Sequence, residues 1–134
     1  MTVRTHDVPK AKSGLYRRRS EEFRAAAGAA AALRHWDVAV SNAVHSAIAG
    51  ADAVTVRKLR LRSAAQGHAD AIGLLRSLPA DLRRRDRAVR HLAALLAVKF
   101  EAEYGDRGLG SRDWQAARAQ LERFLEWVGE TLGP

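Results

Sequence analysis

The sequence predicts an all-α protein, a five-helix up-and-down bundle. Apolar residues recur three and four positions apart over several long stretches, no stretch shows the alternation of a strand, and short polar or glycine-containing breaks separate them. With 134 residues, 47% of them apolar, the chain can build one domain with a packed core. We expect that domain over residues 13–134, after a flexible basic arm over residues 1–12, which is polar and contains Pro9.

The first two helices are rich in small residues. Ser13 is the expected N-cap of a helix over residues 14–33, whose alanine-rich middle around Gly28 allows close approach of another helix. A polar joint follows, in which Trp36 is expected to plug the end of the bundle. The second helix has the three-and-four spacing of a buried stripe, formed by Ala39, Val40, Ala43, Val44, Ala47, Ile48, Ala51 and Val54.

Three further helices are predicted in the second half. A short helix over residues 68–78 is closed by Pro79, because proline cannot continue a helix. An arginine-rich entry then leads into a helix over residues 82–104. After a break with three glycines, the last helix begins near Ser111 or Asp113.

The positive charge of the chain is concentrated in its first two thirds. The net charge is +8, and residues 1–90 hold 18 Lys and Arg against 8 Asp and Glu, whereas residues 91–134 hold 5 against 7. A basic surface favours a polyanion or an acidic partner. The alternative interpretation is that the arginines only line solvated helix faces.

Composition and motifs exclude several classes of protein. The chain has no cysteine, so disulfides and cysteine-ligated zinc are excluded. No two histidines have i,i+3 or i,i+4 spacing, and no phosphate-binding or dinucleotide-binding glycine motif is present, so we expect neither a metal nor a cofactor. No apolar run approaches membrane-spanning length, which leads us to expect a cytoplasmic protein without a membrane partner.

In the order and spacing of its helices and motifs, the chain resembles the HEPN family of small helical bundles. The residues that carry the resemblance are Asn42-Ala43-Val44-His45-Ser46-Ala47, Gly67-His68, Lys99 with Glu103-Tyr104, Ala117-Arg118 and Phe124-Leu125. Many HEPN proteins are metal-independent ribonucleases that use an Arg followed by a His after four to six residues, with sites from two subunits meeting at a dimer interface. Others lack the motif and act as antitoxins, as RNA- or nucleotide-binding modules, or as assembly partners.

Two positions compete for the family motif. Arg85 and His91 match it formally, with His91 as general acid and base and Arg85 stabilising phosphate charge. Helix order instead places the motif at residues 99–104, a degenerate version in which neither an Arg nor a His is present. Six residues apart on one helix, Arg85 and His91 point about 120° apart, so within a single chain they cannot easily share a substrate.

Other charged residues are candidates for binding. Arg17, Arg18, Arg83, Arg84 and Lys99 are expected to bind nucleic acid or phosphate, and the two arginine tracts would form a composite patch if the fold brought them together. Lys99 and Glu103 are spaced for an i,i+4 ion pair, and Tyr104 for capping the bundle. His45 is expected to be a hydrogen-bonded core or interface histidine.

The leading hypothesis is a non-catalytic or degenerate HEPN-like bundle, a homodimer that binds RNA, a nucleotide or a neighbour-encoded protein partner, as in a toxin–antitoxin or defence system. The alternative is a metal-independent endoribonuclease that uses Arg85 and His91 at the dimer interface.

Overall fold

The chain folds into an all-α bundle, which confirms the predicted fold class. The computed structural model describes residues 3–64 and 68–134, with side chains left undescribed at 68–69 and 102–104. Its five helices are α1 (Ser13–Ala32), α2 (Trp36–Leu59), α3 (His68–Arg76), α4 (Arg85–Tyr104) and α5 (Ser111–Leu132). None of the helices among the described residues is long and apolar enough to cross a membrane.

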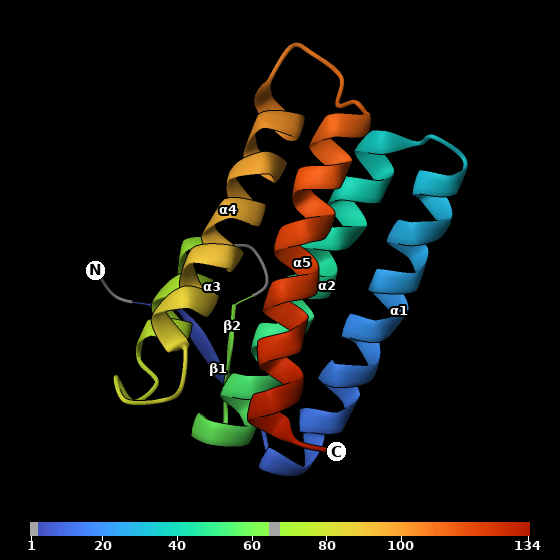
Figure 1. The fold of residues 1–134 in the computed structure, drawn as a ribbon. Coiled ribbons are helices and arrows are strands. Elements are labelled where there is room, and N and C mark those ends of the chain that lie inside the picture. The colour runs from blue at the N-terminus through green and yellow to red at the C-terminus, as the bar shows by residue number, and fades with distance from the viewer. Residues whose placement is uncertain (1–2, 65–67) are drawn as a thin grey trace.

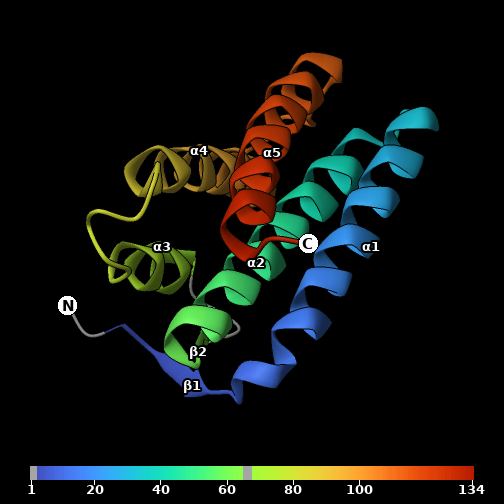
Figure 2. The same ribbon diagram turned by 60° about the horizontal axis from the view of Figure 1, so that its bottom comes forward.

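Helix α2 is the centre of the bundle. Every residue from Ala49 to Val56 is buried, and α1, α3, α4 and α5 all pack against α2 (Figures 1 and 2). Large side chains of the surrounding helices complete the core, among them Leu75, Leu92, Leu95, Leu121 and Phe124. This stretch of the helix is buried on all sides because its small residues let neighbouring helices approach it.

The α1–α2 contact is held by a reciprocal pair of buried serines. The hydroxyl of Ser20 donates to the carbonyl of Ser46 at 2.7 Å, and the hydroxyl of Ser46 donates to the carbonyl of Ser20 at 2.7 Å. Gly50 makes the same approach possible, because a Cβ there would lie 3.2 Å from Oγ of Ser20 and 3.1 Å from Cδ2 of Leu125. The two helices can therefore pack closely without leaving polar groups unpaired.

The N-terminal segment differs from the expected flexible arm. Residues Thr5–Asp7 form strand β1, which pairs antiparallel with strand β2 (Leu61–Ser63), with His6 opposite Arg62. The ladder begins where α2 ends, because Arg60 adopts a left-handed conformation (φ 58°) that turns the chain back, and its carbonyl accepts a hydrogen bond from Val8 at 2.9 Å. A short 3₁₀ turn over Lys10–Lys12 then leads into α1.

Several predicted helix ends shift in the structure. Ser13 is the first residue of α1 and does not cap it, because its hydroxyl donates to the carbonyl of Ala53 at 2.7 Å. Trp36, expected in a joint, begins α2. Helix α4 begins three residues later than predicted, since Arg84 has a left-handed backbone (φ 59°) that cannot continue a helix.

Candidate functional site

An arginine-lined pocket lies between the start of α4 and the second half of α5. Its volume is about 210 Å³. Arg84, Arg87 and His91 line it from α4 and the residue before it, where a spacing of three and four places them on one helix face. Arg123, Glu126 and Trp127 line it from α5, and Ala88 completes the lining. The antiparallel α4–α5 hairpin thus brings together side chains that are more than 30 residues apart in sequence.

The imidazole of His91 is held in a fixed orientation. Its Nδ1 lies 2.7 Å from Oε1 of Gln120 on α5. An amide oxygen can only accept a hydrogen bond, so Nδ1 is the donor in this contact. Histidines that bind or transfer a proton at one ring nitrogen commonly have a hydrogen-bond partner at the other ring nitrogen, which orients the ring.

Trp127 fixes the wall of the pocket. Its ring is buried and lies 5.8 Å, centre to centre, from the ring of Phe124. Its Nε1 donates to the carbonyl of Arg83 at 2.8 Å. The start of α4 is therefore tied to α5 by a part-buried hydrogen bond, which holds this wall of the pocket in place.

The pocket is positively charged and has unused donors. Arg84 donates to both carboxylate oxygens of Glu130 at 3.3 Å. Arg87 and Arg123 are exposed and have no hydrogen bond or ion pair within residues 3–64 and 68–134. A guanidinium has five donors and no acceptor, and its fork matches the oxygens of a phosphate. Small-molecule pockets measure roughly 300–1,000 Å³, so this smaller pocket suits a single phosphate group better than a whole nucleotide.

Arg85 is turned away from this pocket. Its Nη1 donates to the carbonyls of Arg76 and Leu78, at 2.9 and 2.8 Å, and its Nη2 donates to Asp86 at 2.8 Å. Its guanidinium therefore binds the carbonyls at the end of α3, and it is largely buried, with 16% of the side chain exposed. Within one chain the structure does not bring Arg85 and His91 together.

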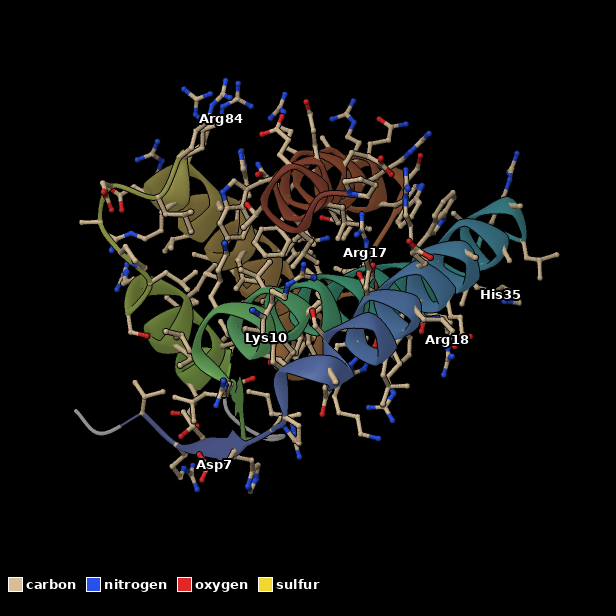
Figure 3. All side chains as sticks on the ribbon, turned by 90° about the horizontal axis from the view of Figure 1, so that it is seen from below. Asp7, Lys10, Arg17, Arg18, His35 and Arg84 are labelled. Carbon is tan, nitrogen blue, oxygen red and sulfur yellow. The ribbon has the colours of Figure 1, made fainter. Side chains whose placement is uncertain are left out.

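The two arginine tracts lie apart. Arg17 donates to the carbonyl of Gly133 at 2.6 Å, and Arg18 forms an exposed i,i+4 ion pair with Glu22 at 4.0 Å. Figure 3 shows Arg84 at one edge of the bundle, well away from Arg17 and Arg18. The two tracts therefore do not form the expected composite patch. Four arginines of these tracts were predicted to bind phosphate, and of these only Arg84 lines the α4–α5 pocket. The exposed Arg83 adjoins it.

The segment where the family motif was expected is separate from the pocket. Lys99 is half-buried on α4, about 22 Å along the helix from Arg84 at 1.5 Å per residue. The side chains of Glu103 and Tyr104 lie outside the described residues. The ion pair between Lys99 and Glu103 and the capping role of Tyr104 stay predictions.

Of the two positions expected for His45, core or interface, the structure excludes the core, and the interface position stays a prediction. His45 is exposed on α2, and its ring lies 5.3 Å from the ring of Phe23 on α1, tilted by 33°. The helix face that carries it is therefore turned toward the surface and not toward the core.

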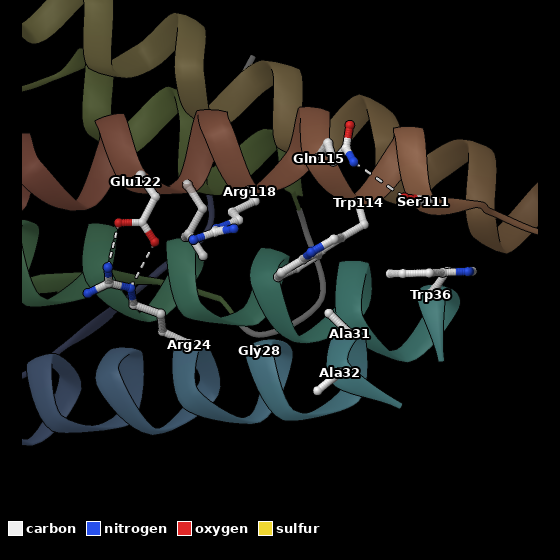
Figure 4. A pocket seen from close by; sticks show the side chains of 11 residues that line it. Arg24, Gly28, Ala31, Ala32, Trp36, Ser111, Trp114, Gln115, Arg118 and Glu122 are labelled. Atoms are coloured by element: carbon white, nitrogen blue, oxygen red, sulfur yellow. Dashed lines mark hydrogen bonds and ion pairs between the residues drawn. The ribbon is translucent and has the colours of Figure 1, made fainter. Parts of the chain in front are cut away.

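A larger groove of about 580 Å³ runs between α1 and α5. Figure 4 shows Trp114 reaching from α5 across α2 toward α1, with Trp36 beyond it at the end of the groove. Arg24 is neutralised there by a bidentate pair with Glu122, which leaves Arg118 as the lining cation without a hydrogen bond or ion pair to another described residue. The groove is therefore less suited to an anion than the α4–α5 pocket.

Sequence reasoning missed Arg87, Arg123 and Gln120. Arg87 follows Arg84 by three positions and precedes His91 by four, so a helical wheel would have placed it on their face. Arg123 and Gln120 become neighbours of these residues only through the register in which α4 and α5 pack. The contact between His91 and Gln120 shows this register most clearly.

Comparison of the chain with models of known protein families, with curated proteins and with solved structures found no match. Within the described part of the chain, no group of three or more His, Asp or Glu side chains is placed to hold a metal ion. The chemistry of the site is therefore inferred from its own geometry: an oriented imidazole, arginines with free donors, and a cavity of about 210 Å³.

Proposed function

We propose that this protein is a non-catalytic HEPN-like bundle that binds RNA through its backbone phosphates, with the α4–α5 pocket as the contact. The observation that carries the proposal is the convergence of Arg84, Arg87, His91 and Arg123 on one small pocket. Arg87 and Arg123 have no partner among the described residues, so binding a phosphate would give them one without breaking an existing ion pair.

The charge distribution supports a polyanion over an isolated anion. The basic residues extend well beyond the pocket, with a net charge of +8 over the chain. Contacts with several phosphates along a strand would use this charge, because each one releases counterions from the nucleic acid. The pocket has no exposed aromatic platform, since Trp127 is buried, so binding would depend little on base identity. The predicted homodimer would present two such pockets.

The test is the affinity of a fluorescently labelled single-stranded RNA, measured by anisotropy at about 50 mM salt. The double variant Arg87→Ala/Arg123→Ala should bind at least about tenfold more weakly, because it removes two sets of hydrogen bonds to charged groups, which contribute about 1.5–3 kcal/mol each and less where they are exposed. The control is Arg57→Ala/Arg112→Ala, which removes the same charge from exposed arginines outside the pocket. The control should retain most of the affinity.

Two results would overturn the proposal. The first is an absence of RNA binding by the wild-type protein at low salt, which would favour a protein partner. The second is cleavage of the RNA in EDTA that is lost in His91→Ala. The contact of His91 Nδ1 with Oε1 of Gln120 at 2.7 Å is the observation that favours this alternative, an endoribonuclease, in which Arg85 of a second subunit would have to approach His91.

A further inference from the structure

The groove between α1 and α5 is bounded at one end and half-open to solvent along its length. Arg17 donates to the carbonyl of Gly133, and Arg24 pairs with Glu122, so two arginines of α1 tie this helix to α5. From the second of these ties the groove, with a volume of about 580 Å³, runs to Trp36 (Figure 4). It shares no lining residue with the α4–α5 pocket, so the two sites are separate.

The groove has the length of two to three turns of a helix. It extends along α1 from Arg24 to Ala32 and along α5 from Ser111 to Glu122. At a rise of 1.5 Å per residue, these stretches measure about 12 and 16 Å. Both walls are helices, and two helices pack with their axes 8–10 Å apart when the side chains between them are small. A further helix laid along the groove could therefore contact α1 on one side and α5 on the other.

The α1 wall has no polar side chain near the groove. Residues 25–33 are only alanine, glycine and leucine, and several of them are exposed, among them Gly28, Ala32 and Leu33, the last by 68%. The solvent-facing side of a helix normally carries polar and charged residues, and contiguous exposed apolar surface marks an interaction site. A Cβ at Gly28 would meet nothing within 4 Å. This wall therefore leaves room for the side chains of another molecule.

The α5 wall supplies aromatic surface and a positive charge. Trp114 is half-buried and lines the groove, as Trp36 does at its end. Figure 4 shows Arg118 between Trp114 and the pair of Arg24 with Glu122, and Arg118 has no hydrogen bond or ion pair to another described residue. Covering this guanidinium would be costly unless the ligand brought a carboxylate to it. The net charge of +8 likewise favours an acidic ligand over a basic one.

We propose that this groove binds an acidic amphipathic helix of a partner protein. Apolar residues of that helix, spaced three and four apart, would lie against the small residues of α1 and against Trp114. An Asp or Glu at the middle of the groove would pair with Arg118. A half-open groove suits a helix that buries one face and leaves the other in water. The proposal is independent of RNA binding at the α4–α5 pocket.

The test titrates the full chain with two synthetic helical peptides of about 16 residues. Both have the same leucine stripe at three-and-four spacing and no Trp, and the positions flanking the stripe are Glu in one and Gln in the other. Binding is followed by tryptophan emission at about 150 mM salt, because Trp36 and Trp114 line the groove. The Glu peptide should bind about two- to fivefold more tightly than the Gln peptide, the effect of one surface ion pair. Arg118→Ala should remove most of this difference, and the matched control Arg57→Ala, at an exposed arginine outside the groove, should keep it.

Two glycines of α1 provide a matched pair of steric variants. A Cβ would meet nothing within 4 Å at Gly28, which lines the groove, or at Gly14, which does not, so both leucine variants should fold. Gly28→Leu should weaken binding of the Glu peptide at least about tenfold, because the new side chain fills the groove. Gly14→Leu should retain the wild-type affinity. Arg87→Ala/Arg123→Ala should retain it too, which distinguishes this groove from the RNA site.

Three results would each contradict a partner helix in this groove. The first is that neither peptide binds at millimolar concentration. The second is an equal affinity of Gly28→Leu and Gly14→Leu for the Glu peptide, which would place the peptide elsewhere on the surface. The third is a smaller species in sedimentation for Gly28→Leu but not for Gly14→Leu, which would show that a second copy of the chain occupies the groove.

Discussion

At the scale of single residues, Arg85 joins two parts of the fold. Its guanidinium donates to the carbonyls of Arg76 and Leu78 while it pairs with Asp86. Arg85→Ala would leave these carbonyls without their donor, so we expect the free energy of unfolding to fall by about 1.5–3 kcal/mol. Urea denaturation measures this change in the free energy of unfolding. Arg87→Ala, an exposed arginine two positions on, should change stability by less than about 0.5 kcal/mol. An equal loss of stability in the two variants would contradict the role of Arg85 in joining α4 to the end of α3.

Asp52 should make stability depend on pH. Burial raises its pKa from 3.8 to about 6, opposed by the hydrogen bonds from Ser63 and by the nearby charge of Arg62. Because the folded-state pKa is raised, Asp52 stabilises the fold most below pH 4, and this contribution is lost as the pH rises through 6. Wild-type stability relative to Asp52→Asn should therefore fall by about 2 kcal/mol between pH 4 and pH 7. Chemical denaturation at several pH values measures this, and Asp106→Asn should show no such trend.

At the scale of helices, two glycines should respond to substitution in opposite directions. A Cβ at Gly28 would meet nothing within 4 Å, whereas one at Gly50 would meet Leu125 at 3.1 Å and Ser20 at 3.2 Å. We expect Gly28→Ala to stabilise the protein by about 0.5–1 kcal/mol through helix propensity. Gly50→Val should destabilise it by about 1–3 kcal/mol, because it overpacks the contact among α1, α2 and α5. Thermal unfolding of both variants is the measurement, and stabilisation by Gly50→Val would contradict this packing.

The helices could be predicted from the sequence because their apolar spacing is regular, but two features at their ends could not. The pairing of β1 with β2 involves only three residues on each side and depends on the left-handed turn at Arg60, which no local pattern indicates. Ser13 has the composition of an N-cap, yet a tertiary contact uses its hydroxyl, since the carbonyl of Ala53 lies 2.7 Å away. Local propensity predicts elements well, and tertiary hydrogen bonds decide where they end.

At the scale of the whole molecule, the site could be predicted only in part. His91 and Arg84 were identified from sequence, because histidines and arginine tracts are visible there. Their neighbours on α5 depend on the hairpin register, which places Gln120 opposite His91 and Trp127 opposite Arg83. Arg85, which matches the family motif together with His91, points away from His91 for a similar reason. Its guanidinium donates to the carbonyls at the end of α3, a tertiary contact that the sequence does not indicate.

The salt dependence of RNA binding tests the phosphate contact most directly. For single-stranded nucleic acid, each phosphate neutralised contributes about 0.7 to the slope of log K against log salt. The account predicts that Arg87→Ala/Arg123→Ala lowers the magnitude of the slope by about 1 to 1.5, and that Arg57→Ala/Arg112→Ala lowers it by clearly less. Equal slopes for the wild-type protein and the pocket variant, at whatever affinity, would contradict a phosphate bound between α4 and α5.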